Sequence, residues 1–414
     1  MNVTRLGKLK QHLKEKSGDE TIRIGSQLVE RKRIRTGVFT YDLALGGGYP
    51  IGLCAMNAGW EGAGKTTMFM KAIGDAQKRC ANCWRYAKDI EVEEQGDGSD
   101  VEYVQTGNCD CFITGELPEV SIKKNETKDE FVARIERYKT NSYEQVICAM
   151  IDLEQTFDAH WASKHCDPRL LLLLQLGAAD EVSDVYIDLM ATGEVHVIML
   201  DSVALITGAE EVEESQAKYQ QGLQARHVGK MIRRILSQQA NTRRDYHVDV
   251  THFWVNQYIE KIGVMFGKST TYPGGNRQRF FYSVITEWFQ SKKEKETVKI
   301  DGLKNDDQDE VMIAKRLNYE VVKNKTSPDG RKGSFRFVVR DHGGKKAGSV
   351  DDLDFIVDLL CVRGYMIKES AQKWVLLGEP FQSRTAAVKY IRDTEGVRQR
   401  LEEMLMDNLI ENQE

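Results

Sequence analysis

The sequence predicts an α/β fold built on a mostly parallel, twisted sheet with helices on both of its faces. Three observations lead to this expectation. Short apolar runs alternate with helical patterns from Arg35 to about Gln290. A glycine-rich turn lies at 59–64, where one expected strand meets one expected helix. After Gly344 helical patterns dominate, which indicates a small C-terminal α-rich domain.

Each expected element rests on an apolar run or on apolar residues at helical spacing. Strands are expected at 51–57, 146–153, 169–175, 195–201, 249–256, 283–290, 316–323 and 333–340. Helices are expected at 64–78, 178–191, 219–240, 350–363, 383–392 and 394–411. The charged segment 291–312, between two of the strands, indicates an exposed hairpin or loop.

The N-terminal segment carries Val3, Leu6, Leu9 and Leu13 at helical spacing, which predicts a short amphipathic helix over 3–16. Such a helix either packs on its own domain or docks on a neighbouring subunit. The expected organisation has four parts: an N-terminal helix and linker at 1–34, a core at 35–345, an insertion within that core at 80–145, and a C-terminal domain at 346–414.

The composition is that of a soluble globular protein, because 41% of the 414 residues are hydrophobic and 29% are charged. No apolar run approaches the length of a membrane span, and the N-terminus lacks the apolar core of a secretion signal. We therefore expect a cytoplasmic protein without a membrane partner. Its eight cysteines are then reduced thiols or metal ligands rather than disulfides.

The net charge of −5 does not exclude nucleic acid as a partner, because the charges are unevenly distributed. The stretch from Arg226 to Arg244 holds six Lys and Arg residues and no acidic residue. The insertion at 80–145 has the opposite bias, with fifteen acidic and eight basic residues. A basic stretch on a helix is either a nucleic-acid or subunit contact or simply a solvated face.

The segment from Gly59 to Thr67 matches the phosphate-loop pattern G-x-x-x-x-G-K-T. Glycines let the backbone curl so that its N–H groups point at phosphate oxygens, and a helix N-terminus adds partial positive charge. In this pattern Lys65 reaches the β- and γ-phosphates, and the Thr66 hydroxyl ligates Mg²⁺. The alternative is a glycine-rich turn without a ligand. The candidate nucleotide-binding residues are Gly59, Trp60, Glu61, Gly62, Ala63, Gly64, Lys65, Thr66 and Thr67.

Two acidic residues follow other expected strands. Asp201 ends the run 195–200, and an acid at that place can hold Mg²⁺ as in a Walker B element. Glu154 follows the run 148–151, and a carboxylate there could polarise the water that attacks the γ-phosphate. The alternative for Glu154 is a carboxylate that caps the following helix.

Three further segments occur in a fixed order along the chain. Arg35-Thr36-Gly37 with Tyr41-Asp42 precedes the phosphate loop, Lys261–Gly267 with Gly274-Gly275-Asn276 lies far beyond it, and Val322-Lys323-Asn324-Lys325 comes last. Together they resemble the bacterial RecA family of recombinases, over residues 34–79 and 146–345. The last two resemble the second DNA-binding loop and the intersubunit lysine motif of that family.

The resemblance implies roles around the nucleotide. Glu154 falls on the catalytic glutamate, Asp158 on an acid that contacts the adenine, and Trp161 on an aromatic that stacks on the adenine. Gln257 falls on the γ-phosphate sensor, whose amide transmits nucleotide occupancy to the loop that follows it. For Trp161 the alternative is core packing on a helix.

The resemblance also implies a DNA-binding surface. The expected contacts are Arg226, Lys261, Gly263, Val264, Met265, Phe266, Gly274, Gly275 and Asn276. Phe266 also matches an aromatic that touches the next subunit, whereas Ile259 stands where the family has an arginine. The first DNA loop falls near 207–221 and is acidic here, so the cations come from Arg226, Lys230, Arg233 and Arg234 on the next helix.

Lys323 and Lys325 alternate along an expected strand, so both would project from one face. In the family this pair reaches across the subunit interface and neutralises transition-state charge on the neighbour's ATP. A RadA-type helicase would carry Arg-Phe-Gly after these lysines, where this chain has Thr326-Ser327.

The insertion contains Cys80-x-x-Cys83 and Cys109-x-Cys111. Four thiolates in two close pairs suit tetrahedral Zn²⁺, and the polar chain between them has little apolar material for a core of its own. Incidental free thiols are the alternative. The acidic balance of the insertion argues against a contact with DNA and favours either a contact with protein or a decoration on the outer surface of the filament.

The resemblance therefore implies an ATP- and Mg²⁺-dependent DNA recombinase. We expect it to form a helical filament on single-stranded DNA, to hydrolyse ATP in response to DNA, and to exchange strands with a matching double-stranded DNA. The alternatives are a ring-forming helicase or branch-migration motor of the same fold and a DNA-coating protein with an inactive nucleotide site.

Overall fold

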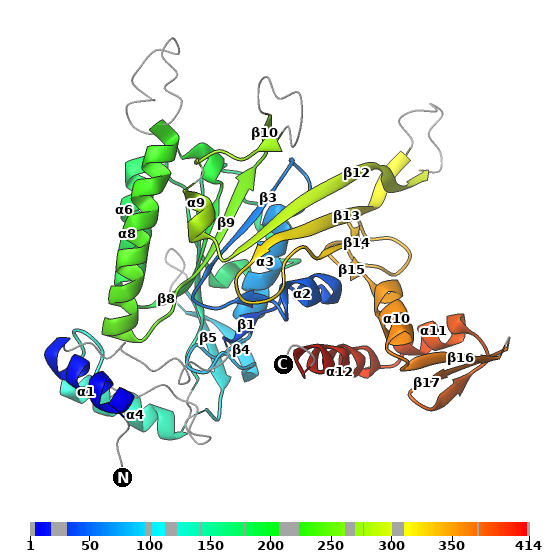
Figure 1. The fold of residues 1–414 in the computed structure, drawn as a ribbon, viewed down its shortest axis with the longest axis horizontal. Helices are drawn as coiled ribbons and strands as arrows, with labels where there is room; N and C mark the ends of the chain where they lie inside the picture. Colours follow the sequence, from blue (N-terminus) through cyan, green and yellow to red (C-terminus); the bar gives the residue numbers. More distant parts are fainter. Residues whose placement is uncertain are drawn as a thin grey trace. The chain divides into compact units, whose positions relative to one another are not determined.

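The computed structural model describes residues 5–17, 31–95, 102–111, 122–140, 143–177, 179–206, 223–260, 270–275, 277–299, 310–370 and 372–411 (Figure 1). These residues belong to two units, which are described separately below. The first comprises Met1–Ile34, Pro50–Gly59 and Lys65–Ile285, and the second Arg35–Tyr49, Trp60–Gly64 and Thr286–Glu414.

The first unit is organised around parallel strands in the order β3-β9-β8-β6-β7. Neighbouring strands in this order pair in parallel, as the alternation of strands and helices predicts. Their bounds are β3 Cys54–Gly59, β6 Ile147–Asp152, β7 Leu171–Leu174, β8 Val195–Asp201 and β9 Thr251–Gln257. Nearly every residue of β3, β6, β8 and β9 is buried, which is typical of parallel strands covered on both faces.

Helices pack on these strands through apolar side chains. Helix α3 (Lys65–Ala76) stacks Phe69 on Phe253 of β9, with 4.6 Å between the ring centroids. Helices α6 (Ala179–Ala191) and α8 (Leu223–Tyr246) lie side by side (Figure 1), and the Thr242 hydroxyl donates to the Met190 carbonyl at 2.8 Å. The shorter elements of this unit are α1 Arg5–Ser17, β1 Arg33–Ile34, α5 Ala159–Ala162, η2 Pro168–Leu170, η3 Val203–Leu205, β10 Ile259–Glu260, β11 Thr270–Thr271 and α9 Gln278–Phe281.

The insertion folds as a hairpin and a helix. Strands β4 (Lys88–Gln95) and β5 (Glu102–Asn108) pair antiparallel, and α4 spans Lys128–Thr140. The hairpin was not predicted from the sequence, because acidic residues dominate β4 and reduce its strand propensity. Before α4, Lys124 pairs with Asp245 at the end of α8 at 3.1 Å, so this part of the insertion is tied to the unit that it interrupts.

The second unit contains a run of strands in the order β15-β14-β13-β12, with antiparallel pairing from β13 to β15. Their bounds are β12 Val284–Lys299, β13 Glu310–Asn324, β14 Lys332–Val338 and β15 Val350–Asp351. Strands β12 and β13 extend into the charged segment 291–312, so that segment is in part a strand pair, as the hairpin interpretation expected.

The segment before the phosphate loop packs on these strands. Asp42 of α2 (Phe39–Leu45) accepts hydrogen bonds from the Thr36 backbone and hydroxyl, both at 2.8 Å, and from the Gly37 backbone. The Tyr41 hydroxyl contacts those of Tyr49 and Thr286, each at 2.8 Å. The first residues that suggested the RecA resemblance therefore have a structural role of their own. Strand β2 is Tyr49–Pro50.

The C-terminal part of the second unit contains helices and a small sheet. Helices α10 Leu353–Val362, α11 Arg384–Asp393 and α12 Val397–Glu411 match the expected elements. Three antiparallel strands between these helices were not predicted: β16 Met366–Ser370, β17 Lys373–Leu376 and β18 Glu379–Phe381. Helix α2 contributes Phe39 to the buried apolar cluster of this region.

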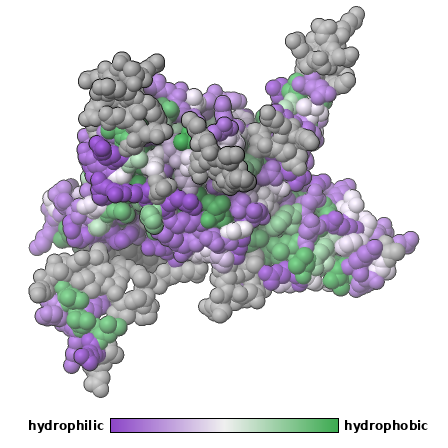
Figure 2. All heavy atoms as spheres, turned by 45° about the horizontal axis from the view of Figure 1, so that its top comes forward, coloured by the Kyte–Doolittle hydropathy of each residue, from purple (hydrophilic) through white to green (hydrophobic). Residues whose placement is uncertain are grey.

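Hydrophilic residues predominate over the described part of the face drawn in Figure 2, while the large apolar side chains gather in the core. Among the described helices, none combines the length and the apolar character that a membrane crossing requires.

Candidate nucleotide and DNA site

Several candidate site residues lie at the ends of four neighbouring parallel strands. Gly59 of β3 pairs with Gln257 of β9, and Asp152 of β6 pairs with Asp201 of β8. Because carboxyl ends of parallel strands meet at one edge, the start of the phosphate loop, the sensor and the acids share that edge. This is where open α/β sheets bind their ligands.

The turn from Trp60 to Gly64 needs glycine at two positions. Gly62 and Gly64 have φ values of +69° and +93°, which residues with a side chain rarely adopt. A Cβ on Gly64 would also lie 2.7 Å from Cδ1 of Leu317 on β13. The turn is further held by Lys315 of β13, whose Nζ donates to the Gly62 carbonyl at 2.6 Å.

Lys315 was not among the sequence-predicted site residues. It is half-buried, and burial lowers the pKa of its ammonium, with the charge of Lys295 acting in the same direction. No local pattern could have indicated it, because it lies 253 residues from its partner along the chain.

Helix α3 begins at Lys65, directly after the turn. Asn57, a polar residue inside the buried strand β3, donates to the Lys65 carbonyl at 3.1 Å and so joins the strand to the helix start. An asparagine within an otherwise apolar strand is the sequence signal that could have indicated this contact, because a buried polar side chain needs a hydrogen-bond partner. Thr66 donates its hydroxyl to Oδ2 of Asp201 at 2.7 Å, and Thr67 follows in the first turn.

Asp201 is 4% exposed, and its Oδ1 atom has no hydrogen-bond partner among the described residues. Burial raises the pKa of this carboxyl to about 7, and the charge of Glu154 raises it too, against the hydrogen bond from Thr66 and the charge of Lys65. An unsatisfied carboxylate oxygen beside a hydroxyl suits a hard cation such as Mg²⁺, which prefers oxygen ligands. The residues present therefore fit this metal.

Glu154 lies two residues beyond the end of β6, and its Oε1 accepts a hydrogen bond from Nε2 of Gln257 at 2.7 Å. The helix that follows is capped by Asp158 instead, whose Oδ1 accepts from the Trp161 backbone at 2.6 Å. Asp152 accepts from the Phe157 backbone at 3.0 Å and from Gln175 at 3.2 Å, which holds the connection that carries Glu154.

Asp158 and Trp161 lie at the start of the short helix α5. The Trp161 ring is half-buried and meets the His165 ring edge-on, with 5.2 Å between centroids. Burial lowers the pKa of His165 to about 3, so this imidazole is neutral at physiological pH. Both candidate adenine contacts thus also have local structural partners.

The expected DNA loops are only partly described. Lys261, Gly263, Val264, Met265, Phe266 and Asn276 lie outside the described residues, as does the first loop at 207–221. The base of the second loop is closed by β10 and β11, where Ile259 pairs with Thr271 and Glu260 with Thr270.

Gly274 and Gly275 are described, with φ values of +94° and +76°. A Cβ on Gly275 would lie 2.7 Å from the Cβ of Ala225 in the first turn of α8. The end of the second expected DNA loop therefore meets the helix that follows the first.

Helix α8 presents Arg226, Lys230 and Arg233 on one exposed face, at spacings of four and three residues. Arg234 does not belong to this face. Its Nη1 contacts Asp184 at 2.6 Å and the Ser183 hydroxyl at 2.7 Å, both on α6. Arg234 therefore has a counter-ion on the neighbouring helix, and its availability for DNA or another subunit stays a prediction.

The two candidate intersubunit lysines lie at the end of β13. The strand ends at Asn324, whose side chain donates to the Leu45 carbonyl at 3.1 Å and accepts from the Thr326 backbone at 2.9 Å. Lys323 thus lies in the strand and Lys325 just beyond it, in a turn organised by Asn324. Because Lys325 lies outside the strand, strand alternation does not place the two lysines on one face.

The four cysteines of the insertion come together. The sulfur atoms of Cys80, Cys83, Cys109 and Cys111 all lie within 4.8 Å of one another. The hydrogen bond from Cys80 lowers the pKa of the Cys83 thiol to about 5. The remaining cysteines, Cys54, Cys148, Cys166 and Cys361, are not part of this group.

The matching family model and the curated relatives agree on one family. The model of the RecA N-terminal domain matches residues 131–342, slightly more than half of the chain. Protein RecA of Bacteroides thetaiotaomicron is 27% identical over 391 residues, covering 94% of this chain and 91% of the relative. Protein RecA of Bartonella tribocorum is 26% identical over 384 residues, covering 92% and 85%. A crystal structure of the RadB recombinase aligns with 73% of this chain and 96% of its own, at 13% identity and a TM-score of 0.41.

Proposed function

This chain belongs to the RecA family, through its match to the RecA N-terminal domain, and we propose from that premise that it is a DNA-dependent ATPase that exchanges DNA strands. It polymerises as a helical filament on single-stranded DNA and pairs that strand with a matching duplex. The observation that carries the proposal is the hydrogen bond between Gln257 and Glu154, at the edge where the phosphate loop begins.

The proposed reaction is attack of water on the γ-phosphorus of ATP. The phosphate loop and Lys65 would bind the phosphates. Thr66 and Asp201 would hold Mg²⁺, which would supply positive charge to the phosphate oxygens when bound. Glu154 accepts a proton as the water oxygen bonds to phosphorus, and the bond to the bridging oxygen breaks to release ADP and phosphate. Asp158 and Trp161 contact the adenine.

The DNA-binding surface is proposed where the two loops meet. The packing of Gly275 against Ala225 supports this placement, because it brings the end of one loop to the helix that follows the other. Arg226 and Lys230 supply exposed cations beside it, and Lys261 would add one from the second loop. Direct contacts from Gly263 to Phe266 and at Asn276 belong to the same proposal.

The filament is proposed from Lys323 and Lys325. As cations supplied from one subunit to the ATP of the next, they would make hydrolysis depend on assembly. The N-terminal helix α1 (Arg5–Ser17) exposes Leu6, Leu9 and Leu13, which suits docking on a neighbouring subunit. Exposed leucines on an amphipathic helix favour this role over a purely solvated one.

The test combines ATP turnover, strand exchange and imaging of the full chain. We expect turnover to rise on adding single-stranded DNA, and strand exchange between a circular single strand and a linear duplex. Electron microscopy with ATP and single-stranded DNA should show helical filaments. Closed rings with duplex unwinding would replace the proposal with the helicase alternative. DNA binding without turnover would point to a DNA-coating protein.

A further inference from the structure

The cysteine group lies at the base of the insertion. Cys80 and Cys83 are in the turn that follows α3, and Cys109 and Cys111 follow the end of β5. The first pair therefore continues the helix of the phosphate loop, whereas the second pair ends the hairpin of the insertion. A ligand held by all four sulfurs would join these two elements.

The sulfur positions match a single ion. Zinc bonds to thiolate at about 2.3 Å, so the four sulfurs of a tetrahedral site lie about 3.8 Å apart. The sulfurs here all lie within 4.8 Å, and those of Cys83 and Cys109 are 3.5 Å apart. A disulfide needs about 2.05 Å, and a cluster of iron and sulfide spreads its four cysteine sulfurs wider than one ion does.

The surroundings are those of a metal-organised subdomain. The buried cluster at this place consists of Cys80, Cys83, Cys111 and Tyr143, with Ala87 and Cys109 packed against it. Its apolar content is therefore mostly the thiols themselves. Such a small group provides little hydrophobic stabilisation, and metal binding supplies folding free energy in domains of this kind.

The backbone around the first pair is fixed by hydrogen bonds. The Trp84 N–H donates to the Cys80 carbonyl at 2.7 Å, and the Cys80 N–H donates to the Arg85 carbonyl at 2.9 Å. Arg79 is buried and donates to the Trp84 carbonyl at 2.7 Å while pairing with Asp75 of α3. None of these contacts involves the hairpin strands. They fix the turn so that the Cys80 and Cys83 thiols face the second pair.

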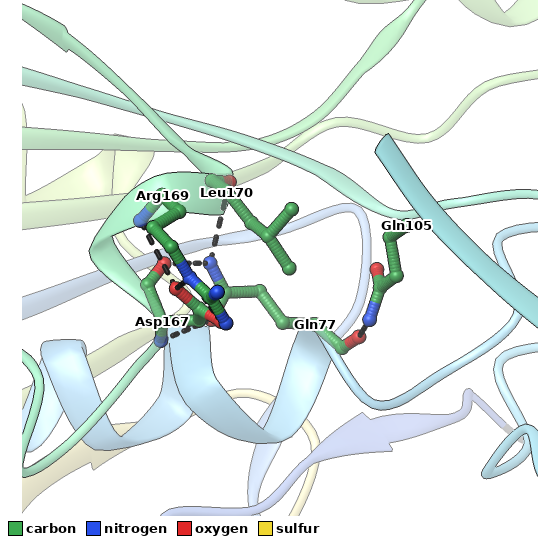
Figure 3. A network of polar contacts seen from close by, with 5 residues as sticks. All are labelled: Gln77, Gln105, Asp167, Arg169 and Leu170. Carbon is green, nitrogen blue, oxygen red and sulfur yellow. Dashed lines mark hydrogen bonds and ion pairs between the residues drawn. The ribbon is translucent and has the colours of Figure 1, made fainter. Parts of the chain in front are cut away.

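Strand β5 is attached to α3 at a second point, drawn in Figure 3. Gln105 of β5 donates to the Gln77 carbonyl at 2.8 Å, directly after α3 ends. The Gln77 side chain in turn donates to the Asp167 carbonyl at 2.9 Å and accepts from the Asp167 N–H at 2.8 Å. The hairpin therefore has one amide contact and one thiol cluster that fix it to the same helix end.

We propose that Cys80, Cys83, Cys109 and Cys111 bind one Zn²⁺ ion, which fastens the β4–β5 hairpin to the end of α3. The site is structural, because four thiolates leave no open position for a substrate. The hydrogen bond from Gln105 to Gln77 positions β5 beside the end of α3, and the ion joins the base of the hairpin to the same helix end.

The first test measures metal content in the full chain, purified under reducing conditions without chelators. We expect about one zinc per chain and no iron or acid-labile sulfide. Cys80→Ser and Cys109→Ser should each lose most of the zinc, while the matched controls Cys166→Ser and Cys361→Ser keep it. Cobalt added to the metal-free protein should give the visible absorption of a tetrahedral thiolate site.

The second test measures the proposed mechanical role. Removing zinc with a chelator should speed limited proteolysis between residues 85 and 111 at least several-fold, and zinc should restore protection. If Cys80→Ser does not fold, Cys109→His keeps four ligands and should retain zinc where Cys109→Ser loses it.

Metal-free protein that binds no cobalt would overturn the proposal. So would equimolar iron and sulfide, or a Cys83–Cys109 disulfide in place of zinc. These readouts do not depend on ATP or DNA, so they stand apart from the recombinase proposal.

Discussion

The Gln257 side chain donates a hydrogen bond to Glu154 across 2.7 Å, so the expected phosphate sensor is bound to the expected catalytic acid. An amide can release this carboxylate and donate to a phosphate oxygen instead. The same residue immediately precedes Tyr258 and β10, at the base of the second expected DNA loop. Exchange of one partner for the other would link nucleotide occupancy to that loop.

Gln257→Ala should therefore bind ATP normally and lose most of the difference in DNA affinity between the ATP and ADP states. That difference is a coupling free energy, which is typically about 1–3 kcal/mol. Fluorescence anisotropy of labelled single-stranded DNA in both nucleotide states measures it. Gln238→Ala, on the half-buried side of α8, is the control and should keep the full difference. A mutant that retains the ATP-dependent gain would locate the switch elsewhere.

Glu154→Gln should slow ATP hydrolysis by about 10²–10⁴-fold, because general-base catalysis contributes about that much. The amide keeps the size of the side chain, so binding of ATP and DNA should persist. Phosphate release reports turnover, and a fluorescent ATP analogue reports binding. Glu194→Gln removes an exposed acid before β8 and should leave turnover unchanged. Near-normal hydrolysis by Glu154→Gln would remove this residue from its proposed role.

Lys323→Ala and Lys325→Ala should each reduce DNA-stimulated turnover, since each removes a cation proposed to act on the neighbour's ATP. Mixing either variant with Glu154→Gln should restore part of the activity, because some interfaces then combine one intact half from each. Lys332→Ala, which breaks an exposed ion pair with Glu320, serves as the control. Co-assembly of the mixed variants without any recovery would contradict action between subunits.

Arg226→Ala and Lys230→Ala should weaken DNA binding and make it less sensitive to salt. Each lost phosphate contact should reduce the slope of log affinity against log salt by about 0.7 for single strands. Arg234→Ala is a matched control from the same helix, because this arginine pairs with Asp184 on α6. Equal slopes for all three variants would show that the exposed face of α8 is only solvated.

Because of His252, the free energy of unfolding should decrease in mild acid. Burial lowers the pKa of this imidazole to about 3, well below the value of about 6.5 in an unfolded chain. Nδ1 lies 2.8 Å from the Tyr186 hydroxyl and Nε2 lies 3.2 Å from Oε1 of Gln239. Because Trp254 donates to that hydroxyl, the hydroxyl is free to donate to Nδ1, which suits the neutral ring.

As the pH falls below about 6.5, His252 takes up a proton in the unfolded state but not in the folded state, so the free energy of unfolding decreases. Between pH 7.5 and 5.5 this group should account for about 1.4 kcal/mol of lost stability. Urea unfolding at the two pH values measures it. In His252→Gln the loss of stability between these pH values should be smaller by that amount. His160→Gln changes an exposed histidine and should behave as the wild type. The same pH response in wild type and His252→Gln would exclude this origin.

The sequence predicted the strands and helices that have long apolar patterns. The phosphate loop, Glu154 after β6 and Asp201 at the end of β8 could be predicted as site residues because strand-end positions follow directly from chain order. Strand β4 was missed because its charged side chains suppress the apolar signal, while its pairing partner and the thiols that support it are distant in sequence. Lys315 and the counter-ion of Arg234 depend on tertiary contacts, which no local pattern contains.

The insertion begins and ends at one place in the fold. Cys80 and Gln145 form an antiparallel bridge, and the Ala81 N–H donates to the Glu144 carbonyl at 2.8 Å. The path of the chain from α3 into β6 is thus already closed without the residues between. Closing a longer surface loop costs little additional entropy. Evolution could lengthen, replace or delete this module without shifting the register of β6, and a reporter domain could be spliced in at the same junction.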